Sequence, residues 1–148
     1  MDDKALVHAA LQARKFSYSP YSHFQVGAAL LCGNGEIITG CNIENAAYTP
    51  TICAERTAFF RAVSQGIYDF LTIAIVGGKE DAETLEFCAP CGVCRQVMME
   101  LCNPETFRIL LAKSENEYQE FTLNQLLPMG FGPDNLKQSG KEKKETYD

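Results

Sequence analysis

The chain has no long hydrophobic run: no apolar stretch among its 148 residues approaches the roughly 20 that a helix needs to cross a bilayer. It also lacks an excess of basic residues, because 13 Lys and Arg stand against 19 Asp and Glu, for a net charge of -6 and a pI near 4.9. A surface that follows nucleic-acid phosphates needs the opposite sign. We therefore expect no membrane and no nucleic-acid partner, but a small-molecule substrate.

The seven cysteines are not preceded by a secretory leader, which predicts a cytoplasmic, reducing location. In that setting an odd number of cysteines near motifs indicates metal binding and not a disulfide framework. With 46% hydrophobic residues the chain is large enough for one domain with a substantial core. We predict a single catalytic domain over residues 1–136 and a disordered charged tail over residues 137–148.

Hydrophobic periodicity and turn residues divide the chain into alternating helices and strands. Helices are expected over residues 4–16, 53–65, 91–102 and 123–127, and strands over residues 26–32, 36–41, 71–76, 107–111 and 118–122. The helix over 53–65 should stop at Gly66, and the strand over 71–76 should close at Gly77 and Gly78. The pattern predicts an α/β fold, a three-layer α/β/α sandwich with a mixed central sheet of about five strands.

Three cysteines have the spacing of a catalytic zinc site. Pro90 can open a helix, which places Cys91 and Cys94 on one face of its first turn. Cys53 follows a turn at residues 49–51 and should also begin a helix, where the positive helix end favours the thiolate. A structural zinc site closes with four protein ligands, whereas a catalytic site keeps one position for water. Three sulfurs therefore predict one catalytic Zn²⁺ per subunit.

Charged residues beside these cysteines have two alternative interpretations. Glu55 can lie beside the open zinc position and accept a proton from water, or it can be an exposed acid in the first turn of a helix. Arg56 and Arg95 can donate hydrogen bonds to the sulfurs and draw off negative charge, or they can be surface residues.

Cys88 is close enough to compete for the metal, and as a fourth ligand it would make the zinc structural. Otherwise it is a small buried side chain, as are Cys32, Cys41 and Cys102.

Four ordered segments, at residues 24–29, 42–46, 53–58 and 90–96, resemble the small, homotetrameric, zinc-dependent cytidine deaminases. The resemblance covers roughly residues 4–133, and the agreement of four motifs makes it specific. It implies hydrolytic deamination of cytidine and 2′-deoxycytidine to uridine and 2′-deoxyuridine plus ammonia, in pyrimidine salvage. In this family the glutamate, here Glu55, moves the proton and is not a metal ligand.

The resemblance also assigns the nucleoside contacts. It implies that Phe24 packs on the pyrimidine, that Asn42 and Glu44 hold the ribose hydroxyls, and that the backbone N–H of Ala54 meets the ring carbonyl. Without it, Phe24 would be interpreted as a core residue. Asn42 and Glu44 stand two positions apart just after a strand, where alternation would put both side chains on one face. Without the resemblance, however, they would be interpreted as a turn.

By the same resemblance the homotetramer shares its active sites. Ala46, Tyr48 and Phe131 would reach the pocket of a neighbouring subunit, whereas ordinary core or interface packing is the alternative for the two aromatic residues. Two positions depart from the family pattern. Ala89 stands where relatives often carry serine or threonine, which affects how ammonia is released, and Gln25 stands where proline is common.

Three other functions stay open from the sequence. A deaminase of an aminonucleoside antibiotic, such as the blasticidin deaminases, would share the scaffold. A polynucleotide-editing deaminase would share the metal site, but the acidic charge and the lack of basic or aromatic insertions argue against it. A zinc-stabilised binding module would need a fourth protein ligand.

Overall fold

A five-stranded mixed sheet forms the centre of the protein, which the computed structural model describes over residues 2–137. Its spatial order is β2-β1-β3-β4-β5, and only β3 and β4 run parallel. The strands are β1 (Phe24–Cys32), β2 (Ile37–Cys41), β3 (Phe70–Lys79), β4 (Arg108–Ser114) and β5 (Glu117–Thr122). The predicted mixed sheet of about five strands is confirmed.

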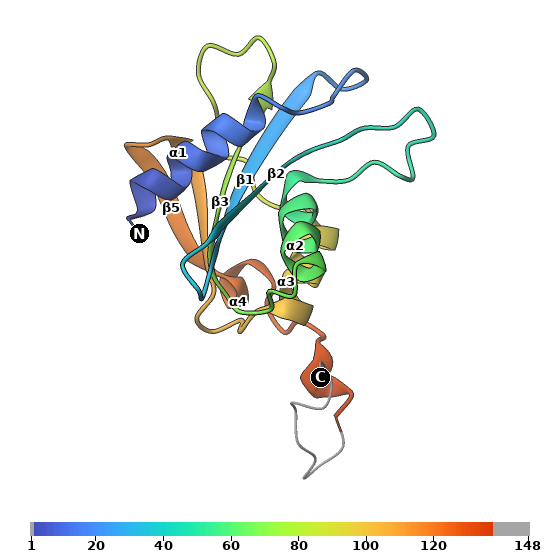
Figure 1. Cartoon of the computed structure of the whole chain (residues 1–148), viewed down its shortest axis with the longest axis vertical. Coiled ribbons are helices and arrows are strands. Elements are labelled where there is room, and N and C mark those ends of the chain that lie inside the picture. Colours follow the sequence, from blue (N-terminus) through green and yellow to red (C-terminus); the bar gives the residue numbers. More distant parts are fainter. Residues whose placement is uncertain (1, 138–148) are drawn as a thin grey trace.

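Helices cover both faces of this sheet (Figure 1). They are α1 (Asp3–Arg14), α2 (Ala54–Ser64), α3 (Gly92–Leu101) and the short α4 (Leu123–Leu126), followed by a 3-10 turn at Pro133–Asn135. Successive strand residues point to opposite faces of the sheet, so each strand contributes side chains to two hydrophobic cores. In β1, Ala29 packs with Leu6 and Ala10 of α1, whereas Leu30 packs with Phe59 of α2 and Met98 of α3. The predicted α/β/α layering is confirmed.

Strand β3 is longer than the sequence pattern predicts. We expected Gly77 and Gly78 to end it, but the strand continues to Lys79 and pairs with β1 along this whole length. A Cβ atom on Gly77 would lie 2.8 Å from the Cys88 Sγ atom. The glycine therefore lets the segment containing Cys88 cross close to the sheet, and it does not terminate the strand.

The predicted tail, apart from Lys137, lies outside the described residues. Between residues 2 and 137, no helix combines the length and the apolar character that crossing a membrane requires.

Candidate metal centre and substrate site

Three thiols from two helix starts meet at one point. Cys53 is the N-cap residue of α2, Cys91 is the N-cap residue of α3, and Cys94 lies in the first turn of α3. Their sulfur atoms all lie within 4.8 Å of one another, and those of Cys53 and Cys91 are 3.7 Å apart. Tetrahedral zinc with bonds of about 2.3 Å separates its sulfurs by roughly 3.8 Å. The cluster therefore fits a zinc ion.

The backbone at both helix starts explains this convergence. Cys53 and Cys91 have extended φ and ψ, and neither side chain caps its own helix. Each sulfur is therefore free for another partner, in front of the positive helix end. Our prediction that Pro90 opens the second helix is wrong, because Cys91 is the N-cap and Pro90 precedes it. The proline instead supplies a carbonyl that accepts a hydrogen bond from Arg95.

The Cys53 and Cys94 sulfurs differ in their affinity for protons. Hydrogen bonds from the Cys94 thiol and from Arg56 lower the pKa of the Cys53 thiol to about 5. The pKa of Cys94 is raised, because its proton is held by Cys53 and the side chain is buried. A metal cation binds the thiolate form, so its arrival must displace the proton shared by this pair.

Arg56 contacts the cluster, whereas Arg95 does not make the sulfur contact that was one of its two alternatives. The Nη2 atom of Arg56 donates to the Cys53 sulfur at 3.4 Å, and this interaction raises the pKa of the guanidinium. Arg95 instead donates to the carbonyl oxygens of Pro90 and Leu126, at 2.8 and 2.5 Å. It thus ties the start of α3 to the end of α4, because its guanidinium is turned toward backbone carbonyls.

Cys88 stands apart from the metal cluster. Among residues 2–137, the group close enough to share an ion consists of Cys53, Cys91 and Cys94. The Cys88 thiol packs against Gly77, and burial raises its pKa to about 11. A neutral thiol is a poor metal ligand. The arrangement therefore does not supply the fourth protein ligand that a structural zinc site needs.

Glu55, the second residue of α2, is only 4% exposed. The alternative of an exposed first-turn acid is therefore wrong. Burial raises the pKa of its carboxyl to about 7, where it can both accept and release a proton near neutral pH. Ala54, the first residue of the same helix, is fully buried, and its backbone N–H has no acceptor within the helix.

The Asn42 side chain links β1 to the segment before it. Its Oδ1 atom accepts from the Ser17 hydroxyl at 2.5 Å and from the Val26 N–H at 2.9 Å. Its Nδ2 atom donates to the Phe24 carbonyl at 2.8 Å. These bonds hold the start of β1 in place. An asparagine carboxamide has two N–H groups, so one donor of Asn42 stays available.

The Glu44 carboxylate is anchored to residues 21 and 22. Its Oε1 atom accepts from the N–H groups of Tyr21 and Ser22, both at 3.0 Å, and its Oε2 atom accepts from the Ser22 hydroxyl. These bonds, chiefly that from the Ser22 side chain, lower the pKa of Glu44. Ser17 and Ser22 could not be identified from the sequence, because neither belongs to a recognisable motif and both act through contacts that the fold creates.

The three residues expected at a subunit boundary are exposed in the single chain. Ala46 lies in the same exposed loop as Tyr48, which is 73% exposed and has a φ of 64°, and Phe131 is 57% exposed. Core packing within this chain is therefore wrong for both aromatic residues. The Phe131 carbonyl accepts a hydrogen bond from Gln96 of α3 at 2.8 Å, which fixes this segment against the second metal helix.

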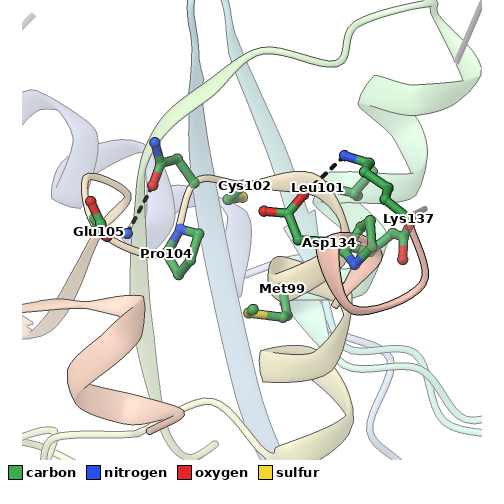
Figure 2. Close-up of a pocket in the computed structure, with 10 residues that line it drawn as sticks. Met99, Leu101, Cys102, Pro104, Glu105, Asp134 and Lys137 are labelled. Carbon is green, nitrogen blue, oxygen red and sulfur yellow. Dashed lines mark hydrogen bonds and ion pairs between the residues drawn. The ribbon is translucent and has the colours of Figure 1, made fainter. Parts of the chain in front are cut away.

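Two cavities differ in whether a predicted substrate-binding residue lines them. One of about 430 Å³ includes Met99, Cys102 and Asp134 (Figure 2) in its lining, at the end of α3 opposite the metal cysteines. Another of about 400 Å³ is lined by Glu44, Ser22, Tyr21, Asn45, Tyr48 and Thr51. Only the second contains a predicted substrate residue.

The layered α/β fold brings three sulfurs to the spacing of zinc ligands, and it buries the Glu55 carboxyl in the first turn of α2, next to Cys53. This is the arrangement of a zinc-dependent hydrolytic enzyme. Residues 1–109 match the family model described as the cytidine and deoxycytidylate deaminase zinc-binding region. The chain therefore belongs to the cytidine and deoxycytidylate deaminase family. Membership makes it a zinc-dependent hydrolytic deaminase.

Relatives match over nearly the whole chain. It is 48% identical to a cytidine deaminase of Halalkalibacterium halodurans, over 92% of this chain and 98% of that protein. It is 44% identical to a cytidine deaminase of Sporosarcina psychrophila, over 96% and 100% respectively. The crystal structure of cytidine deaminase from Burkholderia pseudomallei is similar at a TM-score of 0.80 and 43% identity, covering 88% of this chain and all of that one.

Proposed function

We propose that this protein hydrolyses cytidine and 2′-deoxycytidine to uridine and 2′-deoxyuridine, with release of ammonia. The observation that carries the proposal is the three-sulfur cluster with the buried Glu55 carboxyl beside it. Cys53, Cys91 and Cys94 would hold the zinc, and Arg56 would moderate their negative charge through its hydrogen bond to Cys53. When bound, zinc supplies Lewis acidity that brings the pKa of water toward neutrality.

Glu55 is the group that moves the proton. Its carboxylate removes a proton from water as the water oxygen forms a bond to C4 of the cytosine ring, and it passes that proton to N3 of the ring. Glu55 then takes the proton of the new C4 hydroxyl and gives it to the amine, so that the C4–N bond breaks, ammonia leaves and C4 keeps a carbonyl oxygen. A pKa of about 7 suits both directions of this transfer. The buried Ala54 N–H, unpaired within α2, is a suitable donor to the ring carbonyl.

The sugar contacts support both cytidine and 2′-deoxycytidine as substrates. Asn42 has one N–H left to donate, and Glu44 has about one acceptor position left on Oε2, because three of roughly four are occupied. One donor and one acceptor match one hydroxyl, which can accept and donate at once. A site that holds one hydroxyl does not require both ribose hydroxyls. Phe24 is the first residue of β1, with its backbone N–H bonded to Ser22 and its carbonyl to Asn42, and its ring would pack on the pyrimidine.

We propose that the active enzyme is a homotetramer in which Ala46, Tyr48 and Phe131 complete a neighbouring subunit's pocket. The exposure of both aromatic side chains in the single chain supports this assignment, because large apolar groups left outside a core are typical of interfaces. The seven free cysteines support a cytoplasmic location. A free nucleoside as substrate supports a role in pyrimidine salvage.

The experiment follows the loss of cytosine absorbance when cytidine or 2′-deoxycytidine is added to zinc-replete protein. Rapid conversion of both substrates is expected. A parallel reaction with an aminonucleoside antibiotic tests the alternative substrate class. Conversion of the antibiotic alone, with zinc bound, would refute the proposed function.

A further inference from the structure

One serine hydroxyl connects the two sides of the proposed nucleoside pocket. The Oγ atom of Ser22 donates to Oε2 of Glu44 and accepts from the backbone N–H of Phe24 at 3.0 Å. Only a group that donates and accepts can make both bonds, and a hydroxyl does so with one atom. Ser22 thus joins the residue proposed to hold the sugar to the residue proposed to pack on the base.

The turn that carries this hydroxyl is fixed by its surroundings. His23 has a φ of 56°, in the left-handed region that non-glycine residues rarely adopt. Its N–H donates to the Ser19 carbonyl at 2.9 Å, and its carbonyl accepts from the Glu80 N–H at 2.8 Å. The Lys79 ammonium also reaches the Ser22 carbonyl at 3.4 Å. These contacts hold a costly backbone conformation, which keeps Ser22 beside Glu44.

We infer that Ser22 is a positioning residue that orients the Glu44 carboxylate for a single hydroxyl of the substrate sugar. This inference rests on the proposed function and deepens it. The two backbone N–H groups bind Oε1 alone, so they leave the position of Oε2 to be set by the Ser22 hydroxyl. Without that hydroxyl the carboxylate can turn about its last torsion, which is a soft one. Its free acceptor position then no longer faces the sugar.

The test compares two substrates that differ at this hydroxyl. Ser22→Ala is expected to raise KM for 2′-deoxycytidine about tenfold, the effect of losing one hydrogen bond to a charged group. The value of kcat should stay close to wild type, because the contact is remote from the reacting atoms. For 2′,3′-dideoxycytidine, which has no sugar hydroxyl for Glu44, Ser22→Ala and wild type should have the same kcat/KM.

Three further comparisons exclude a merely structural effect. Ser22→Thr keeps the hydroxyl and should restore KM, and Ser64→Ala, which removes an exposed hydroxyl at the end of α2, should change nothing. In a Glu44→Ala background, adding Ser22→Ala should have no further effect on KM. Equal losses on both substrates, or a full loss in the Glu44→Ala background, would overturn the inference alone. A wild-type protein that converts neither nucleoside would overturn the proposed function with it.

Discussion

Gly40→Ala should displace the helix that carries Cys53. Gly40 lies in β2 directly under α2, where a Cβ atom would come within 2.4 Å of the Ala54 carbonyl and 2.6 Å of the Ala58 nitrogen. Both partners are backbone atoms, and ordinary contact begins near 3.4 Å. The helix must therefore move by about 1 Å, at a cost of roughly 1–3 kcal/mol in the free energy of unfolding.

A shift of this size matters more for the metal than for the fold, because zinc–ligand distances are held to about 0.2 Å. We expect Gly40→Ala to lose zinc and activity together while it remains folded. Zinc per chain, measured after gel filtration, and urea unfolding would check this. Gly92→Ala in α3 is the matched control for zinc content and stability, since its Cβ meets no atom within 4 Å. A Gly40→Ala protein with full zinc and unchanged stability would refute the close-packing argument.

Three other predictions concern stability and the metal. Phe59→Ala should lower the free energy of unfolding by about 3–5 kcal/mol in urea titrations, because the ring is fully buried and lies 5.1 Å from that of Phe70; a loss below 1 kcal/mol would contradict its core role. The Arg108 guanidinium lowers the pKa of Asp3 and of Glu120 through partly exposed ion pairs. These pairs therefore stabilise the fold above about pH 4, the pKa of the carboxyls in the unfolded chain, and the stabilisation is lost as pH falls through the lowered pKa values. Arg108→Gln should cost at most about 1 kcal/mol at pH 7 and progressively less below pH 4, in urea melts across pH; a difference independent of pH would exclude the ion pairs. A chelator should abolish deamination, and added zinc should restore it; turnover by metal-free protein would contradict the metal's role.

The layers and most elements of this fold could be predicted from local sequence patterns. The hairpin at Gly33–Gly35 and the helix stop at Gly66 depend on neighbouring residues, and both occur as expected. The end of β3 could not be predicted in this way. Gly77 looks like a strand terminator in sequence, but its function is to leave room for Cys88, eleven residues later, and only the tertiary structure shows that contact.

The same distinction holds for the site. Cys91 and Cys94 are close in sequence, and their helical spacing predicts a pair of metal ligands. Cys53 and Glu55 belong to a second short motif, so they too could be identified from the sequence. The partners of Glu44 and Asn42 are a different case: Ser22 and Ser17 are ordinary serines in a loop, brought to these side chains by the fold. For Arg95 the sequence left two alternatives open, a sulfur contact or a surface position, and the fold turns its guanidinium toward two backbone carbonyls.

The proposed role of Glu55 is tested most directly by measuring zinc content and cytidine turnover together in wild type and Glu55→Gln. The substitution keeps the shape of the side chain but removes its ability to carry a proton. We expect one zinc per chain in both proteins and a kcat at least about 10²-fold lower in the variant. Wild-type turnover by a Glu55→Gln protein that retains its zinc would contradict the proposed role of Glu55.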